Sequence, residues 1–259
     1  MDIENELTLV MTASIDPNGM PLAASVVEPV KREQDYANSL SYYLKEHPRV
    51  RRIVFAENSN WPLDKLRQIA VEQSGGQEVE FCSFSLNDFP REWGKSYGEM
   101  LLLDHVFAQS RLLSRSRYVA KVTGRIILRN LTAMLEPAPV PFDFYADLRD
   151  HPLYEWAGIA ASGHHGESRF FVLTPQFYEA HFRGKYPLLK ESEGNYLETL
   201  VYRIVKQTMP LGGVFGRFKT EPEYRGVAGH HDKSYSSQRE RWKQFVRGTS
   251  RKVMPWLWI

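Results

Sequence analysis

The first half of the chain switches regularly between two hydrophobic patterns. Short, nearly continuous apolar runs, typical of buried strands, occur at residues 7–15, 51–57, 78–84 and 117–122. Between them, apolar side chains recur every three or four residues, as in helices packed on one face, at 32–47, 62–73 and 97–113. Strands and helices that alternate at this spacing predict an α/β fold with a mostly parallel sheet and helices on both faces.

The second half has a less regular pattern after the proline-rich residues 137–142. Residues 142–150 have the pattern of a strand, 168–182 that of a strand followed by a helix, and 195–207 that of a helix. No clean domain boundary separates the halves. We therefore expect an irregular C-terminal half that adds strands to the same sheet.

Polar residues follow three of the expected strands. Ligands of parallel sheets bind outside the carboxyl ends of the strands, so these exits predict a binding site. The exit residues are Thr12, Ala13 and Ser14 after the first strand, Glu57, Asn58 and Ser59 after the second, and Thr123, Gly124 and Arg125 after the fourth.

Two segments contain groups suited to phosphate. In YVAKVTGRIIL, residues 118–128, Lys121 and Arg125 flank Gly124, which permits close backbone approach, and the Arg125 guanidinium suits a diphosphate. A surface turn with Arg125 in a salt bridge is the alternative.

In WGKSYGEMLLLDHVF, Lys95 and Gly98 lie where a helix N-terminus could bind phosphate, but the spacing is not that of a Walker loop. The alternative there is a plain helix start with an exposed lysine.

The composition is that of a globular protein and argues against a nucleic-acid-binding, disulfide-stabilised or membrane-spanning protein. Hydrophobic residues make up 42% and charged residues 25%, and the net charge of +2 does not indicate nucleic-acid binding. The single cysteine, Cys82, lies in an apolar run, where we expect it buried; it excludes a disulfide framework and favours the cytoplasm. We expect neither a signal peptide at the acidic N-terminus nor a membrane-spanning helix.

The C-terminal segment, residues 233–252, is basic. Against the single acid Glu240 it contains Lys233, Arg239, Arg241, Lys243, Arg247, Arg251 and Lys252. With the following MPWLWI, it suggests peripheral contact with an anionic membrane, such as the inner face of the cytoplasmic membrane. A solvated helix with an aromatic tail packed on the body is the alternative.

Five short segments, in their order and spacing, resemble bacterial glycosyltransferases of the GT-A type that build capsule and cell-surface polysaccharides. They are TASI (12–15), REQDY (32–36), VFAENSN (54–60), GKSYGE (94–99) and KVTGR (121–125), and similar segments follow at 168–182, 195–204 and 224–236. The resemblance implies one GT-A-like domain over residues 1–259. Residues 1–130 would bind a nucleotide-sugar donor, and residues 131–259 would face a polysaccharide or lipid-linked glycan acceptor.

The sequence departs from this family at its metal site. Many GT-A enzymes carry an Asp-x-Asp motif that binds Mn²⁺ or Mg²⁺, where this chain has Thr123-Gly124-Arg125. These residues offer no carboxylate to a hard cation, whereas Arg125 and Lys121 could neutralise the diphosphate. We therefore expect no metal-binding residues and a metal-independent transferase. Asp147, with Asp150 nearby, is the candidate for a metal site elsewhere.

Sugar transfer with inversion needs a base for the acceptor hydroxyl. The resemblance points to Glu198, at the start of a late helix, with Glu193 and Asp147 as rivals. It also places Arg32 near the nucleotide. His230 and His231 follow two glycines and are candidates for contact with the donor; a metal site shared with the pair His164 and His165 is the weaker alternative, because helical zinc spacing is missing.

Two other classes of function compete with a transferase. A sugar-phosphate nucleotidyltransferase usually has a glycine-rich, basic loop after its first strand, but here only Gly19 and no cation precede Lys31. A non-catalytic polyanion-binding module would use the basic C-terminal segment. It would not explain the polar residues at successive strand exits.

Overall fold

The computed structural model describes residues 3–17, 28–150, 163–226, 246–251 and 253. Its described part contains a seven-stranded sheet in the order β10-β6-β9-β4-β1-β2-β3. These strands are β1 (Leu7–Ala13), β2 (Arg52–Glu57), β3 (Glu78–Ser83), β4 (Tyr118–Thr123), β6 (Phe144–Tyr145), β9 (Phe170–Leu173) and β10 (Val214–Phe215). Strands β3, β2, β1 and β4 are parallel, and β9 is antiparallel to both of its neighbours. The predicted mostly parallel sheet is confirmed.

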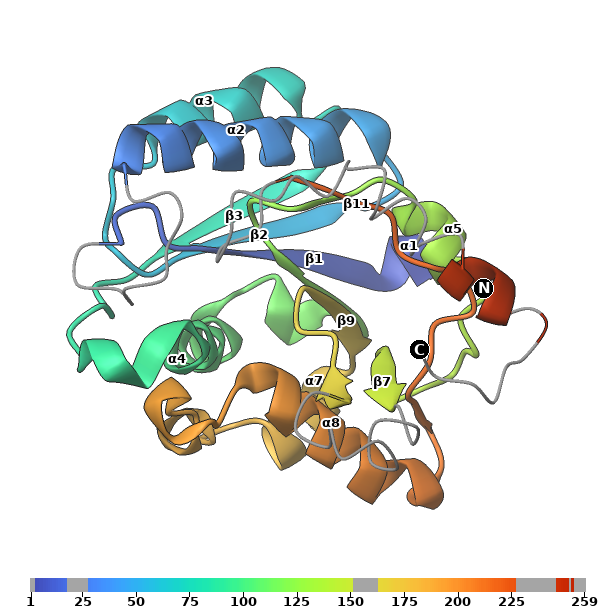
Figure 1. Ribbon diagram of the computed structural model, residues 1–259. Helices are drawn as coiled ribbons and strands as arrows, with labels where there is room; N and C mark the ends of the chain where they lie inside the picture. The colour runs from blue at the N-terminus through green and yellow to red at the C-terminus, as the bar shows by residue number, and fades with distance from the viewer. Residues whose placement is uncertain (1–2, 18–27, 151–162, 227–245, 252, 254–259) are drawn as a thin grey trace.

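Helices cover both faces of this sheet, as predicted (Figure 1). Helices α2 (Pro29–Glu46) and α3 (Asp64–Gln73) lie on one face, and α4 (Gly94–Gln109), α7 (Pro175–His181) and α8 (Leu197–Thr208) lie on the other. Each face has its own apolar core. Strand β1 is buried along its whole length because it lies in the middle of the sheet, which explains its continuous apolar run.

The edge strand β3 differs from β1 because one of its sides has no partner strand in the described sheet. Its residues are exposed or half-buried, and Glu78 and Glu80 give it charges that discourage pairing with other chains. Cys82 is therefore half-buried, not fully buried as expected, and burial raises the pKa of its thiol to about 11.

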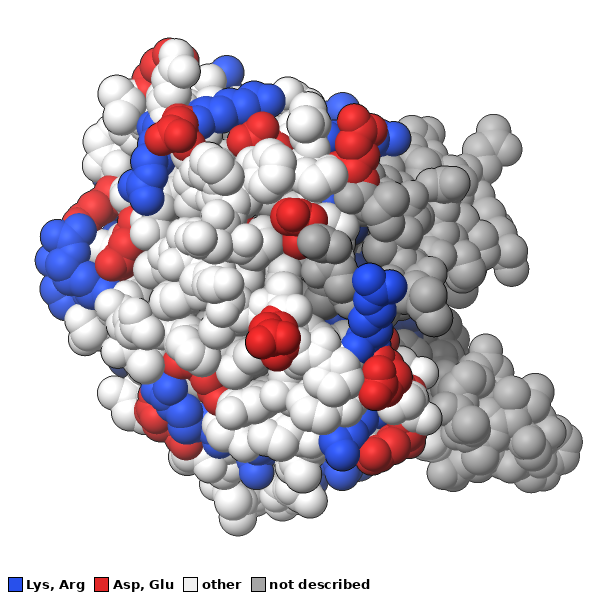
Figure 2. All heavy atoms as spheres, turned by 90° about the vertical axis from the view of Figure 1, so that its left-hand side faces the viewer, with Lys and Arg blue, Asp and Glu red and all other residues white. Residues whose placement is uncertain are grey.

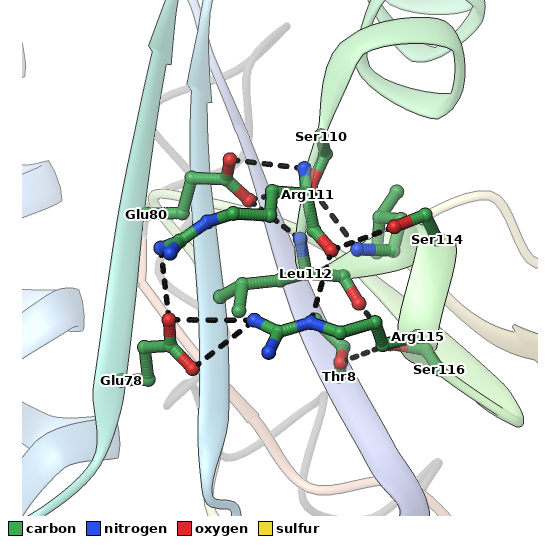
Figure 3. A network of polar contacts seen from close by, with 10 residues as sticks. Thr8, Glu78, Glu80, Ser110, Arg111, Leu112, Ser114, Arg115 and Ser116 are labelled. Carbon is green, nitrogen blue, oxygen red and sulfur yellow. Dashed lines mark hydrogen bonds and ion pairs between the residues drawn. The ribbon is translucent and has the colours of Figure 1, made fainter.

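A polar network anchors the end of α4 to this edge strand (Figure 3). The Glu80 carboxylate accepts hydrogen bonds from Ser110 Oγ (2.7 Å) and from the backbone N–H groups of Arg111 and Leu112 (3.0 Å each). Burial alone raises the pKa of Glu80, but these donors outweigh it and leave the pKa below its ordinary value. The network fixes the turn between α4 and β4, and so the position of β4.

Short elements complete the described chain. They are α1 (Ile3–Glu6), α5 (Leu131–Leu135), β5 (Ile127–Leu128), β7 (Leu148–Asp150), β8 (His164–Gly166), β11 (Tyr224–Arg225), and the 3₁₀ turns η1 (Arg91–Trp93), η2 (Leu113–Arg115), η4 (Tyr186–Leu188), η5 (Glu191–Glu193) and η6 (Met209–Leu211). The single strand expected at 142–150 is in fact two, because β6 joins the main sheet and β7 pairs with β8.

Helix α2 begins earlier than predicted because Pro29 fits a first helical turn. None of the described helices is long and apolar enough to cross a membrane.

Candidate functional site

The sheet contains a topological switch point between β1 and β4. From β1 the chain moves outward to β2 and β3, and then returns to β4 on the other side of β1. The carboxyl ends of β1 and β4 therefore lie side by side where the direction of winding reverses, the usual ligand position in such sheets. Strand β1 runs away from α1 toward the left of Figure 1, so Figure 2 looks onto the side of the molecule where the carboxyl ends of the strands lie. Much of the described surface on that side is uncharged.

A buried lysine lies at the centre of the switch point, on the α4 side of the sheet. The Lys121 side chain is 1% exposed, and its Nζ lies 2.6 Å from Glu99 Oε1. The same ammonium donates to Thr123 Oγ1 (3.1 Å) and to the backbone oxygen of Ser168 (2.5 Å). Thr12 Oγ1 donates to Glu99 Oε1 at 2.7 Å. The ammonium of Lys121 thus pairs with Glu99 inside the protein. We call Lys121, Glu99, Thr12, Thr123 and Ser168 the Lys121 cluster.

Ser168 extends this cluster to α8. Its hydroxyl donates to Glu198 Oε1 at 2.7 Å, while its backbone oxygen binds Lys121. Glu198 lies in the first turn of α8, where a carboxylate interacts favourably with the helix dipole. The structure thus brings Glu198 to the same edge as Thr12, Lys121 and Thr123, across more than 180 residues of sequence.

Glu57 organises the chain on the other side of β1. Its buried carboxylate accepts from the backbone N–H groups of Ile15 (3.0 Å), Ser59 (2.9 Å) and Trp61 (3.2 Å). Asn58 donates its backbone N–H to Ala13 O at 3.2 Å. Because several backbone donors surround Glu57, it shapes the strand exits and does not project toward a ligand.

Two arginines flank the exit of β1 on the α2 side. Arg32 Nε donates to Ser14 O at 2.7 Å, and Arg125 Nη1 lies 3.9 Å from Asp35 Oδ2. Burial lowers the pKa of Arg32, and the positive charge of Arg125 lowers it further. Arg125 Nη1 is buried without a hydrogen-bond partner among the described residues. Two neighbouring guanidinium groups give this position a positive character that suits an anion.

Gly124 has a packing role at this point. Its N–H donates to Thr12 O at 2.8 Å, and a Cβ on it would lie 2.7 Å from that oxygen and 3.2 Å from the Tyr36 ring. The glycine therefore lets the turn after β4 approach β1 closely. This contact holds Thr123 and Arg125 at the edge of the sheet.

The N-terminus of α4, predicted to receive phosphate, holds a carboxylate of the same chain. Ser96 donates to Glu191 Oε1 through its N–H (3.0 Å) and its hydroxyl (2.8 Å). Gly94 lies so close to Glu191 that a Cβ there would clash. Lys95 is half-buried beside this contact and Gly98 is buried in the helix.

Asp147 also has a partner in the protein. Its two oxygens accept from Arg251 at 2.7 and 2.6 Å, and Oδ1 accepts from Phe218 N at 3.1 Å. Arg251 also contacts Glu221 at 2.6 Å and its side chain is 5% exposed, so the guanidinium of this member of the basic C-terminal segment lies inside the protein. Asp147 thus contributes to a buried ion-pair network, and its backbone oxygen accepts from Glu167 N at 2.7 Å, next to Ser168.

The histidine candidates divide into two groups. His230 and His231 lie outside the described residues. His164 Nδ1 lies 2.5 Å from Asp150 Oδ1, and Lys206 Nζ donates to Asp150 Oδ2 at 3.1 Å. Among the residues that the structure describes, no three His, Cys, Asp or Glu side chains are grouped to hold a metal ion.

Two members of the Lys121 cluster were not predicted from the sequence. Glu99 is the central carboxylate, and its signal was a charge within the largely apolar helix of residues 97–113, a signal that Asp104 shares. Ser168 carries no such signal, because its backbone oxygen supplies one of the two contacts.

Comparisons with known proteins give likenesses in structure alone. A scan against protein-family models finds no match, and a search of the curated proteins finds none. Among solved structures, the chain is similar to the galactosyltransferase LgtC in complex with donor and acceptor sugar analogs, at 11% identity over 75% of this chain and 69% of that one, with a TM-score of 0.45. It is similar to the mannosyltransferase Ktr4p from S. cerevisiae in complex with GDP, at 11% identity over 90% and 75%, with a TM-score of 0.46.

A third likeness is to a protein of another class. A cytidylyltransferase from Leptospira borgpetersenii matches at 11% identity over 74% of this chain and 73% of that one, with a TM-score of 0.38. At these identities and TM-scores, none of the three likenesses assigns an activity or a ligand to this chain. The geometry of the site is the basis for a function.

Proposed function

We propose that this chain is a glycosyltransferase that moves a sugar from a nucleotide-sugar donor to a polysaccharide or lipid-linked glycan acceptor. The observation that carries the proposal is the meeting of five separate sequence segments at the switch point. TASI contacts REQDY through Ser14 and Arg32, and VFAENSN through Ile15 and Glu57. It contacts GKSYGE through Glu99 and KVTGR through the Gly124 N–H.

These contacts unite the segments whose order resembles the GT-A glycosyltransferases of bacterial surface polysaccharides. The segments span residues 12 to 125 and are separated from one another in the sequence. Their convergence at the ligand-binding edge of the sheet supports a common role in donor binding.

The donor diphosphate would face Arg32 and Arg125. Both guanidinium groups lie at the exit of β1, and preorganised cations can stabilise negative charge as it develops on a leaving diphosphate. Lys121 contributes indirectly, because its ammonium is occupied by Glu99, Thr123 and Ser168.

A divalent metal does not fit the residues at the end of β4. Thr123, Gly124 and Arg125 provide no carboxylate there, and hard cations such as Mg²⁺ and Mn²⁺ prefer oxygen ligands that include carboxylates. The oxygens of Asp147 both bind Arg251. We therefore propose a transfer that does not depend on a metal.

Glu198 is the proposed base for an inverting transfer. Its carboxylate would accept the proton of the acceptor hydroxyl as that oxygen attacks the sugar and the nucleoside diphosphate leaves. Among the described residues, its hydrogen-bond partner is the Ser168 hydroxyl, which binds Oε1 and orients the carboxylate. Glu193, the rival base, is exposed and pairs with Lys190 at 3.4 Å.

We place the reaction in the cytoplasm, at the inner face of the cytoplasmic membrane when the acceptor is lipid-linked. The support is the basic character of residues 233–252, although one of these residues, Arg251, pairs with Asp147 inside the protein. This part of the proposal concerns chiefly residues outside the described structure.

Thermal unfolding in the presence of nucleotides tests donor binding. UDP, GDP, CMP, ADP and dTDP are each added with and without EDTA, and a ligand of the folded state raises the midpoint. We expect one nucleotide to raise it in EDTA, and Arg125→Ala to abolish the shift. Arg115→Ala, at the opposite edge of the sheet, is the matched control. A shift that EDTA removes would overturn the metal-free mechanism, and no shift with any nucleotide would overturn the proposed donor.

The role of Glu198 is tested with the donor so identified. Glu198→Gln should retain the nucleotide shift while transfer falls about 10²- to 10⁴-fold, the contribution of a general base. Glu193→Gln is the matched control and should transfer normally. If both variants are equally active, Glu198 is not the base.

A further inference from the structure

Four aromatic side chains gather at the start of α4, on the edge of the sheet where the parallel strands end. We call Phe89, Trp93, Tyr97 and Tyr186 the aromatic platform. The Tyr97 ring is its centre, with ring centroids 4.8 Å from Phe89, 4.7 Å from Trp93 and 5.2 Å from Tyr186. Phe89, Trp93 and Tyr186 are half-buried, so they keep part of their rings at the surface.

The platform joins two segments that are distant in sequence. Phe89 precedes η1, Trp93 ends it, Tyr97 lies in the first turn of α4, and Tyr186 comes from η4. The hydrogen bonds from Ser96 to Glu191 hold these segments together. The arrangement is therefore preorganised, which reduces the entropy lost when a ligand binds.

Polar groups border these rings. Lys190 Nζ lies 5.7 Å from the centre of the Trp93 ring and 3.4 Å from Glu193 Oε1. Rings bordered by hydrogen-bonding groups are suited to a ligand with one apolar face and a polar rim, which is the chemistry of a pyranose sugar.

The platform lies close to the Lys121 cluster. Trp93 immediately precedes α4, and from Gly94 to Glu99 the helix rises about 7.5 Å. A sugar ring on Trp93 is thus displaced from Glu99 along the helix. It is near enough to be a neighbouring unit of the same glycan.

We propose that the aromatic platform binds the acceptor glycan, through a sugar ring next to the one that receives the transferred sugar. This inference rests on the proposed function, and it names the acceptor as an oligosaccharide or longer glycan.

Disaccharide binding tests the inference apart from donor binding. Lactose, maltose, mannobiose and chitobiose are titrated into the protein by saturation-transfer NMR, with and without the nucleotide that raises the melting point. We expect at least one to bind, and Trp93→Ala to weaken it about tenfold, the size of an aromatic contact. Tyr186→Ala should act in the same direction, and Trp93→Phe should retain most of the affinity.

Tyr42→Ala is the matched control, because Tyr42 is a half-buried tyrosine on α2, away from the platform. It should bind the disaccharide as the wild type does. Equal binding by Trp93→Ala and Tyr42→Ala overturns the inference, as does failure of every disaccharide to bind. A wild-type dimer that Trp93→Ala converts to a monomer in sedimentation would show that the platform binds a second copy instead. If a disaccharide binds the wild type but no nucleotide raises its melting point, the proposed function is overturned and the platform remains a carbohydrate site.

Discussion

The carboxylate of Glu99 lies 2.6 Å from the ammonium of Lys121, joining helix α4 to strand β4 at the switch point of the sheet. The two partners are unequally buried, since the Lys121 side chain is 1% exposed and that of Glu99 is 21% exposed. Water can therefore reach the carboxylate more easily than the ammonium. Removing the charge of Glu99 and removing the charge of Lys121 should therefore destabilise the folded protein by different amounts.

Glu99→Gln should destabilise the protein more than Lys121→Met. The first leaves a buried ammonium without its counter-charge, at a cost on the order of 3 kcal/mol. The second leaves a carboxylate that water can partly solvate, at a cost of about 1–2 kcal/mol. The double variant should lose less than the sum, because neither charge remains. Urea unfolding of the four proteins measures this, and additive losses would contradict a direct interaction.

Gly124→Ala should also be destabilising, by about 1–3 kcal/mol. Its new methyl group would lie 2.7 Å from the backbone oxygen of Thr12, which belongs to the central strand and cannot easily move. Gly248→Ala is the matched control, because among the described residues its methyl group meets only Glu221 Cβ at 3.9 Å. Thermal melting compares the two. A normal midpoint for Gly124→Ala would show that the close approach to β1 is not required.

Glu167 should make the protein sensitive to acid. Burial alone raises its pKa, but Arg169 and Arg149 outweigh burial and lower the pKa from 4.5 to about 2. A depressed carboxyl pKa stabilises the folded state above pH 4.5, and this stabilisation, on the order of 3 kcal/mol, is lost as the pH falls toward 2. Glu167→Gln should therefore flatten the fall in unfolding free energy between pH 4.5 and 2. An unchanged slope would assign the acid sensitivity to other groups.

His47 should add a second pH dependence near neutrality. Burial lowers the pKa of its imidazole below the usual 6.5, with Glu46 opposing the shift. Both ring nitrogens lack hydrogen-bond partners among the described residues, and the ring packs against Tyr42 and Tyr43. The unfolded chain then takes up a proton more readily, so stability should fall as the pH drops below 6.5.

His47→Phe tests this dependence, because it keeps an aromatic ring and removes the titrating group. The variant should lose the slope in unfolding free energy between pH 7 and 5, as measured by urea unfolding at fixed ionic strength. A variant with the wild-type slope would show that His47 is not the group responsible.

The sequence by itself determined the mostly parallel sheet and the edge at which its polar residues gather. The strand at residues 7–13 is apolar throughout because it is buried on both faces, and so its pattern is visible without the fold. Thr12, Thr123 and Arg125 could be placed together for a similar reason, since parallel strands end at one edge. The extent of the single domain, residues 1–259, stays a prediction.

Only the tertiary structure decided which partner each charge has. Lys121 binds Glu99, Asp147 binds Arg251, and Glu191 occupies the start of α4 in place of a phosphate. Partners such as Asp147 and Arg251 lie far apart in the chain, and a pairing between distant residues leaves no periodic pattern in either segment. Local sequence thus reveals where a charged side chain can lie, while packing determines whether it meets a ligand or another residue of the protein.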